Sequence, residues 1–336
     1  MAVTIAEVAA AAGVSTSTVS RCFATPELVR GDTRLKVLGV AASLGYTPNR
    51  IARSLAVGRS RSIALIVPDI ANLFFGRIVK SAQSRARTKD YAVFLADTDE
   101  RAREEYDLAV AMGKQVDGLL LVSPRMSEEQ LHDIAERTPT VLVNRPLAGR
   151  SCVLVPSTEG MWQAVQHLYA LGHRHCAHIA GARGSWSSER RSLAVREACE
   201  EFGMTLTEFG PYEPFFSSGV RAADPLIASG ATAVVAHNDI VALGVVSRLN
   251  ERRVSVPGDI SVVGADDTLL ARAASPPLTS VRIPLEEVGR RSADLLLDLL
   301  APGEVPPPVE EVRVETELIV RRSTGPVRQE PGTRTS

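Results

Sequence analysis

Short apolar runs recur along most of this sequence, and they constrain its fold more than any other feature. Residues 63–67 read IALIV, and six similar runs of four or five residues follow, most of them separated by stretches with helical spacing. Continuous apolar runs of this length are typical of strands buried on both faces, and strands that alternate with helices form parallel sheets. The runs fall into two sets, so we predict an α/β body of two doubly wound lobes. The other six runs span residues 92–96, 118–122, 140–143, 176–180, 232–236 and 260–264.

Polar residues follow several of these runs. Ligands of doubly wound folds bind beyond the carboxyl ends of the strands, so these residues are candidates for a binding site. Carboxylates, amides, guanidinium groups and aromatic rings that converge on one cleft suit a polyhydroxylated ligand. We expect Asp239 to cap a helix rather than to touch the ligand. The remaining candidates are Asp69, Asn72, Phe74, Phe75, Asn144, Arg145, Asn238, Asp266 and Asp267.

The first 61 residues differ from the rest in charge. They hold eight basic and three acidic residues, a net charge of +5, whereas the whole chain carries −1. A basic head on an acidic body suggests that the head meets a polyanion. A solvated helical surface is the alternative reading of the charge alone.

The beginning of the head predicts two short helices. Thr4 and Glu7 have the spacing of a capping box, and Gly13 suits the left-handed residue that ends a helix. Ser15 can cap a second helix, which carries Val19 toward a core. Two helices joined in this way form a helix-turn-helix, whose second helix enters the major groove of DNA.

Near the start of that second helix, Thr16 and Ser17 would face base edges. Arg21 lies one turn later on the same face and can reach a guanine or a phosphate. An ordinary helical hairpin with a polar outer face is the alternative.

A third helix is expected over residues 33–44, capped by Asp32, followed by a basic linker over residues 49–61 that orders when it meets DNA and a second copy of the chain. We expect the third helix to supply the head's core with Leu35, Leu38, Ala41 and Ala42.

Eight motifs then occur in an order that resembles one family, from Val3 to about Thr324. They are VTIAEVAAAAGVSTSTVSR, LGYTPNRIARSL, RSIALIVPDIANLFFGRIV, VDGLLLVS, LGHRHCAHIAG, AHNDIVALGVV, ISVVGADD and PPLTSVRIP. Together they resemble the lactose-repressor (LacI/GalR) family of transcription factors. The resemblance implies a dimeric repressor that binds double-stranded DNA at an inverted-repeat operator and has a periplasmic-binding-protein-like effector domain.

The resemblance also implies roles for residues of the head. The position that matches Leu55 is a lever on a hinge helix that wedges into a minor-groove step, although the often basic residue after the lever is Ala56 here. The expected DNA-binding residues are Thr4, Ser15, Thr16, Ser17, Thr18, Arg21, Asn49, Arg50, Arg53 and Leu55.

For the body, the resemblance implies a small polar effector, sugar or sugar-like, bound between the lobes. Asn144 departs from the Asp of many sugar-responsive members, and Ala194 replaces a glycine near Arg191, whose neighbour Arg190 competes for the same role. The expected effector-binding residues are Asp69, Asn72, Phe74, Phe75, Ser123, Asn144, Arg145, Ser185, Ser187, Arg191, Phe215, Asn238 and Asp266.

The predicted domain organisation follows from these patterns. Residues 1–48 form the helix-turn-helix domain, 49–61 the hinge, 62–325 the effector-binding and dimerisation domain, and 326–336 a disordered tail. The first lobe is expected to combine residues 62–157 with 284–312, and the second to combine 158–283 with 313–325. The polar tail shows no heptad repeat, so a dimer is favoured over a tetramer.

Other functions find less support in the sequence. No cofactor motif, phosphate-binding loop or nucleophile elbow is present, and His175 and His178 would point to opposite faces of a strand, which is poor geometry for a metal. Scattered cysteines and the lack of a signal peptide or membrane-spanning run indicate a cytoplasmic protein. A solute-binding protein and an enzyme on the same scaffold are the alternatives, and the basic head argues against the first.

Overall fold

The structure is a computed structural model, and it describes residues 3–24, 26–46, 59–303 and 307–328. The chain divides into two compact units. The first, called the head, comprises Met1–Ser62 with Gln115–Asp117, and the second, called the body, comprises Ile63–Lys114 with Gly118–Ser336.

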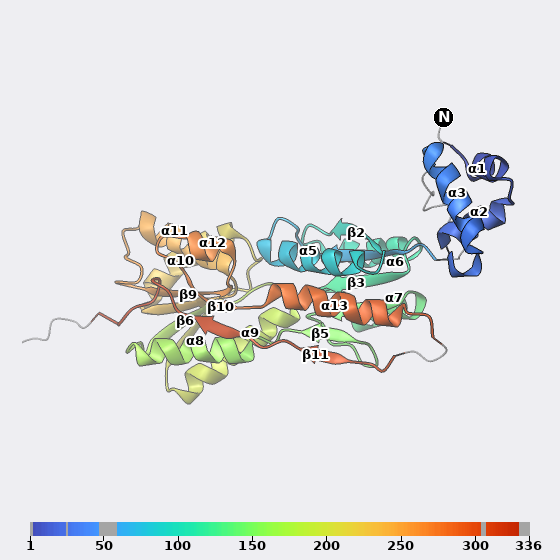
Figure 1. Cartoon of the computed structure of the whole chain (residues 1–336). Coiled ribbons are helices and arrows are strands. Elements are labelled where there is room, and N and C mark those ends of the chain that lie inside the picture. Colours follow the sequence, from blue (N-terminus) through green and yellow to red (C-terminus); the bar gives the residue numbers. More distant parts are fainter. Residues whose placement is uncertain (1–2, 25, 47–58, 304–306, 329–336) are drawn as a thin grey trace, which may run out of the picture. The chain divides into compact units, whose positions relative to one another are not determined.

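In its described residues the head holds three α-helices and a 3-10 turn (Figure 1). The predicted capping box is confirmed, because the Glu7 amide donates to the Thr4 hydroxyl (3.4 Å) and the Thr4 amide donates to the Glu7 carboxylate (2.7 Å). Gly13 ends the first helix with the expected left-handed backbone, φ 67°. The elements are α1 (Ile5–Ala12), α2 (Thr16–Ala24), η1 (Pro26–Leu28) and α3 (Gly31–Ser43).

The third helix differs from the predicted one in its start and in its buried face. It begins at Gly31, so Asp32 lies in its first turn and does not cap it. Leu35 is 72% exposed, whereas Val37 and Ala41 are buried. Residues two apart on a helix point to nearly opposite faces, so Leu35 and Val37 cannot both face the core. The buried core of the head consists of Val8, Ala9, Ala12, Val19, Cys22, Val37 and Ala41.

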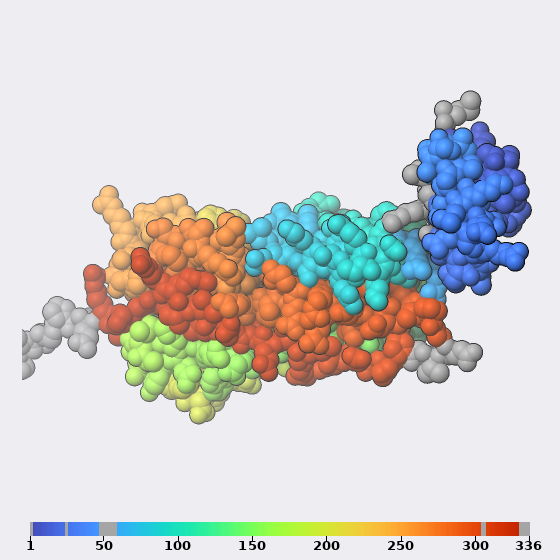
Figure 2. Space-filling view, in the orientation of Figure 1, coloured from blue at the N-terminus to red at the C-terminus, as the bar shows by residue number. Residues whose placement is uncertain are grey.

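Lobe one of the body is built on a six-stranded sheet with the order β11-β5-β4-β3-β1-β2. Its strands are β1 (Ser62–Val67), β2 (Ala92–Asp97), β3 (Gly118–Val122), β4 (Thr140–Val143), β5 (Cys152–Leu154) and β11 (Glu311–Arg313). Every residue of β1, β3 and β4 is buried, as strands covered on both faces require. Its helices are α5 (Leu73–Arg87), α6 (Ala102–Gly113), α7 (Glu128–Arg137) and α13 (Leu285–Leu299), and α13 packs along α5 (Figure 2).

Lobe two repeats this plan with the strand order β12-β10-β9-β8-β6-β7, in which β12 runs antiparallel to β10. Its strands are β6 (His175–Ile179), β7 (Thr205–Phe209), β8 (Ala233–Ala236), β9 (Ser261–Asp266), β10 (Thr279–Arg282) and β12 (Glu317–Ile319). Its helices are α8 (Thr158–Ala170), α9 (Trp186–Glu201), α10 (Phe216–Ser229), α11 (Asp239–Glu251) and α12 (Leu269–Ala273).

The chain crosses between the lobes three times, after β5, after β10 and after β11. The predicted α/β class, with a helical head and two lobes built on largely parallel sheets, is confirmed. All seven predicted strands are present within one or two residues of their expected ends. Five further strands, which have only three to five residues each, were not predicted: β5, β7, β10, β11 and β12. Among the described residues, no helix is both long and apolar enough to cross a membrane.

The histidines near β6 are bound to neighbours inside lobe two. His173 contacts the hydroxyls of Thr232 (2.8 Å) and Ser261 (3.1 Å), and His175 contacts Thr207 (2.9 Å). Burial lowers the pKa of His178 to about 4, and this ring contacts the carbonyl of Val235 at 2.9 Å. These rings therefore act in packing and hydrogen bonding within the lobe.

Two glycines allow helices α10 and α11 to cross at very short range. A Cβ on Gly219 would lie 2.0 Å from the carbonyl oxygen of Val241, and one on Gly244 would lie 2.1 Å from that of Phe216. Both obstacles are backbone atoms, so a side chain could be accommodated only by moving the helices apart.

We therefore expect Gly244→Ala to lower the free energy of unfolding by about 1–3 kcal/mol, the usual effect of overpacking a core. Gly76→Ala, in helix α5, is the control, since its nearest neighbour would lie 3.9 Å away. There the gain in helix propensity should raise stability by up to about 1 kcal/mol. Urea unfolding measures both changes, and equal losses in the two variants would contradict the close crossing.

Candidate functional site

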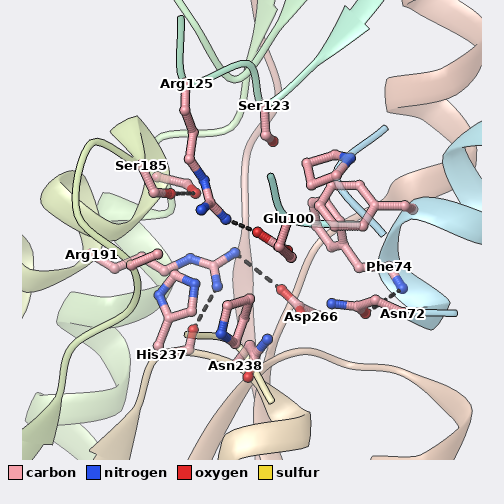
Figure 3. Close-up of a pocket in the computed structure, with 15 residues that line it drawn as sticks. Asn72, Phe74, Glu100, Ser123, Arg125, Ser185, Arg191, His237, Asn238 and Asp266 are labelled. Atoms are coloured by element: carbon pink, nitrogen blue, oxygen red, sulfur yellow. Dashed lines mark hydrogen bonds and ion pairs between the residues drawn. The ribbon is translucent and has the colours of Figure 1, made fainter. Parts of the chain in front are cut away.

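A pocket lies where the carboxyl ends of the parallel strands of the two lobes face each other (Figure 3). The space inside it, including the part open to solvent, is about 490 Å³. Both lobes contribute to its walls, which combine aromatic, charged and amide side chains. The lining residues are Pro68, Asn72, Phe74, Phe75, Glu100, Ser123, Arg125, Ala182, Ser185, Ser187, Arg191, Pro214, His237, Asn238 and Asp266.

Three lining residues occupy the N-cap positions of helices. The Asn72 side chain accepts a hydrogen bond from the Phe74 amide (3.0 Å) and so begins α5. Ser185 accepts one from the Ser188 amide (3.3 Å) at the start of α9, and Asn238 caps α11. Asn and Ser are preferred at such positions because their oxygens satisfy amides that have no partner within the helix. The helix starts therefore fix these side chains at the edge of the pocket.

A buried ion pair forms the wall of lobe two. The Arg191 guanidinium donates to the Asp266 carboxylate (3.0 Å) and to the carbonyl oxygen of His237 (2.6 Å). Arg191 is 3% exposed and Asp266 is 4% exposed. Figure 3 shows the guanidinium between these two partners. Burial raises the pKa of Asp266 to about 6, although Arg191 acts in the opposite direction.

Behind this pair lies a second carboxyl group, that of Asp239. Burial, and then the neighbouring Asp266, raise its pKa to about 7. Asp239 accepts hydrogen bonds from the hydroxyls of Ser280 (2.6 Å) and Thr268 (2.9 Å). It is fully buried and lies outside the lining, and because Asn238 caps α11 and Asp239 is the first residue of that helix, the predicted capping role of Asp239 is wrong.

The wall of lobe one contains a second charged group. Arg125, which follows β3, contacts the Glu100 carboxylate, and its guanidinium lies 3.5 Å from Glu213 of lobe two. The Arg125 amide donates to the buried Glu105 carboxyl group at 2.9 Å. Burial raises the pKa of Glu105 to about 7, against the effect of hydrogen bonds from the Arg125 and Met126 amides.

In the head, helix α2 presents a polar face. Thr16, Ser17 and Arg21 are exposed on it, as the groove-reading prediction requires. The Ser15 hydroxyl accepts a hydrogen bond from the Thr18 amide (3.1 Å), so this predicted DNA-binding residue also stabilises the start of the helix. Thr4 has a similar role at the start of α1.

The family of this chain follows from comparison with known proteins. Residues 4–49 match the model of the bacterial regulatory proteins of the lacI family, and residues 165–324 match that of a periplasmic binding protein-like domain. The chain is 34% identical over 340 residues to the HTH-type transcriptional regulator DegA of Bacillus subtilis, with 97% of this chain and 99% of DegA covered. It is 32% identical to the HTH-type transcriptional repressor PurR of Vibrio campbellii, with 95% of this chain and 98% of that repressor covered.

The chain belongs to the lacI family. It is a DNA-binding transcriptional regulator and not an enzyme. Among solved structures, it is similar to the Lac repressor dimer bound to operator and the anti-inducer ONPF, with a TM-score of 0.86, 27% identity, and 97% of this chain and all of that chain covered.

Two further neighbours contain sugars. The complex of the transcriptional regulator CelR with cellobiose has a TM-score of 0.71 and 33% identity, with 96% of this chain and 99% of CelR covered. A LacI family regulator from Enterococcus faecium with bound ribose has a TM-score of 0.71 and 25% identity, with 80% of this chain and all of that chain covered.

The pocket brings together nine of the thirteen residues that were expected to bind the effector of this lacI-family protein. The lining includes Asn72, Phe74, Phe75, Ser123, Ser185, Ser187, Arg191, Asn238 and Asp266. Arg191 faces the pocket, whereas its competitor Arg190 is exposed and lies over the Trp186 ring.

Four expected residues lie outside the lining. The Asn144 side-chain oxygen accepts a hydrogen bond from the Val155 amide (3.0 Å), and its nitrogen lies 3.5 Å from the hydroxyl of Ser123, which lines the pocket. Asp69 accepts one from the Ala71 amide (2.8 Å). Arg145 also lies outside the lining, and Phe215 is 41% exposed before α10, while its neighbour Pro214 lines the pocket. In the head, Asn49, Arg50, Arg53 and Leu55 fall outside the described residues.

Six lining residues were not predicted from the sequence: Pro68, Glu100, Arg125, Ala182, Pro214 and His237. Pro68 and His237 lie within two of the quoted motifs, Ala182 directly follows a third, and Pro214 directly precedes the expected Phe215. His237 lies in the motif AHNDIVALGVV. Its pKa is held well below the usual value, mainly by burial and to a lesser extent by the Arg191 guanidinium. Glu100 and Arg125 lie three residues beyond the ends of β2 and β3, and this position was the signal that could have identified them.

The raised pKa of Glu105 predicts a pH-dependent contribution to stability. The folded protein holds a proton on Glu105 up to a pH of about 7, whereas the unfolded chain releases it near 4.5. Stability from this group is therefore complete below about pH 4.5 and is lost as the pH rises to about 7. Glu105→Gln removes the titration, so the variant should gain up to about 3 kcal/mol relative to wild type between pH 4.5 and 7.5. Urea unfolding across this range would refute the assignment if the difference between the two proteins stayed constant.

Proposed function

We propose that this lacI-family repressor is controlled by a small, polyhydroxylated effector that binds between the two lobes. The pocket at the carboxyl ends of both sheets carries this proposal, since its walls come from both lobes and combine hydrogen-bond donors, acceptors and apolar faces. An effector that touches both lobes binds the closed arrangement better than an open one. Only such a difference in affinity can shift the conformation and hence DNA binding.

The hydrogen-bonding groups of the pocket favour hydroxyls as partners. The carbonyl oxygens of Asn72 and Asn238 are occupied by the helix caps, which leaves their amide nitrogens to donate to a ligand. The carboxylate of Asp266 can accept from a ligand hydroxyl while it keeps its bond to Arg191. A hydroxyl group both donates and accepts, so adjacent hydroxyls can satisfy both kinds of group.

Apolar faces in the same pocket suit the C–H surfaces of a sugar ring. Phe74 and Phe75 pack edge to face, with centroids 5.0 Å apart, and the prolines Pro68 and Pro214 line the pocket from the two lobes. The cellobiose and ribose in two similar regulators support a carbohydrate-like effector here.

We further propose that two copies of the chain bind an inverted-repeat operator. The similarity to the Lac repressor dimer on its operator supports this arrangement. A two-fold symmetric pair of helix-turn-helix units requires two half-sites in opposite orientation. In each head the exposed residues Thr16, Ser17 and Arg21 of α2 would reach the base edges.

The role of Arg21 can be tested with an operator selected from a random duplex library. A good base contact discriminates by about 1–3 kcal/mol, so Arg21→Ala should weaken binding to the operator about 5- to 150-fold more than binding to random DNA. Fluorescence anisotropy at fixed salt measures both affinities, because phosphate contacts depend strongly on salt. Equal losses on the two DNAs would show that Arg21 contacts phosphate.

The effector site can be tested with Arg191→Ala and Asp266→Asn. Each variant loses a charge-assisted hydrogen-bonding group, worth about 1.5–3 kcal/mol, so affinity for an effector should fall about 10- to 100-fold. A thermal-shift screen of sugars, polyols and sugar acids identifies the ligand, since binding to the native state raises its stability. Calorimetric titration then gives the affinities.

Arg190→Ala is the matched control, because this neighbour is exposed outside the pocket. It should bind the ligand as wild type does. Wild-type affinity in correctly folded Arg191→Ala and Asp266→Asn would show that the effector binds elsewhere. Operator binding by the same variants, with and without ligand, shows whether the effector releases or promotes DNA binding.

A further inference from the structure

Arg125 stands at a point where the two lobes meet across the pocket. It belongs to lobe one, in the loop that follows β3, and its side chain is 14% exposed. On its own lobe it contacts the Glu100 carboxylate, whose side chain is 6% exposed. Its guanidinium also lies 3.5 Å from the carboxylate of Glu213, which lobe two supplies from the loop after β7. The ion pair with Glu213 therefore joins the lobes at the pocket, in addition to the three chain crossings.

Both ends of this ion pair are held in place by backbone hydrogen bonds. The Arg125 amide donates to Glu105 (2.9 Å), and just before it the Ser123 amide donates to the carbonyl of Val143 (2.7 Å). On lobe two, the carbonyl of Glu213 accepts from the Phe215 amide (2.8 Å). Because the backbone of Arg125 is already fixed, its side chain loses less conformational entropy when the ion pair forms. More of the electrostatic attraction therefore remains to hold the lobes together.

The two acidic partners have different environments. Glu100 is buried on the same lobe, so its contact with Arg125 is unaffected by movement between the lobes. Glu213 has a side chain that is 49% exposed, and its distance from Arg125 changes when the lobes separate. The pair with Glu213 is therefore the part of the cluster that senses closure.

We propose that Arg125 is a positioning residue that couples the lobes, so that its ion pair with Glu213 favours the closed body before an effector binds. This proposal rests on the proposed effector site between the lobes. The affinity of an effector for the protein scales with the fraction of protein already in the binding-competent state. The pair would thus set effector sensitivity without being the principal contact to the effector.

The distance between the lobes can be measured without effector and without DNA. Cysteines replacing the exposed Glu136 on α7 and Glu201 on α9 carry a donor and an acceptor fluorophore, and the four natural cysteines are buried. Mixing labelled protein with an excess of unlabelled chain leaves at most one labelled copy in most dimers. Single-molecule energy transfer then reports the closed and open populations.

Glu213→Gln should lower the closed-to-open ratio about two- to five-fold, the range expected for a partly exposed ion pair. Glu213→Lys should lower it further, because like charges would face each other. Raising NaCl from about 0.05 to about 1 M should open the wild type and leave Glu213→Gln nearly unchanged, since salt screens the pair. Arg125→Lys keeps the positive charge and should retain part of the closure.

Glu208→Gln is the matched control, because it removes an ion pair with Arg196 (2.8 Å) that lies wholly within lobe two. Its populations should equal those of wild type. Identical populations in wild type, Glu213→Gln and Glu213→Lys would overturn the proposal, as would an equal shift in Glu208→Gln. These results would not affect the effector site itself, which the ligand titrations on Arg191 and Asp266 test separately.

Discussion

The buried ion pair between Arg191 and Asp266 organises the half of the pocket that lobe two supplies. Removing two charges from water is costly, and a buried pair is tolerated only when further hydrogen bonds complete its geometry. Here the second terminal nitrogen of Arg191 donates to the carbonyl of His237 at 2.6 Å. The Arg191 guanidinium thus connects helix α9 with the ends of β8 and β9, and these three elements together form one wall of the pocket.

Lobe one builds its half of the pocket by different means. Its charged residue, Arg125, is fixed through its backbone by Glu105 and through its side chain by Glu100. Each of these two arginines therefore has a carboxylate partner on its own lobe. The two surfaces are joined by three chain crossings, so a change in their relation would leave both of these pairs intact. A ligand that completes contacts on both surfaces changes that relation by as much as it prefers one arrangement over the other.

The sequence predicted the parts of this fold that burial determines. Strands covered on both faces, such as β3 and β4, must be continuously apolar, and this pattern is legible without a structure. The backbone conformation at the ends of strands is harder to predict from the sequence. Asn144 was expected in the pocket, but its side-chain oxygen accepts from the Val155 amide and it reaches the lining only through Ser123. A shift of one residue separates the expected Phe215 from Pro214, which lines the pocket. Side chains in irregular loops follow no periodicity, so only their position three residues beyond the ends of β2 and β3 marked Glu100 and Arg125.

Helix caps explain why so many of the expected binding residues do lie in the pocket. Helices α5, α9 and α11 begin at Asn72, Ser185 and Asn238, and all three caps line the pocket. In a doubly wound lobe, each helix that follows a strand starts at the carboxyl edge of the sheet, so its N-terminus and its capping residue face the ligand. The partial positive charge of a helix N-terminus attracts lone pairs. The carboxylates of Glu100 and Asp266, in contrast, attract hydroxyl hydrogens. A wall with both characters suits a ligand whose groups donate and accept at the same atom, and in this pocket the helix starts at Asn72, Ser185 and Asn238 supply its positive side.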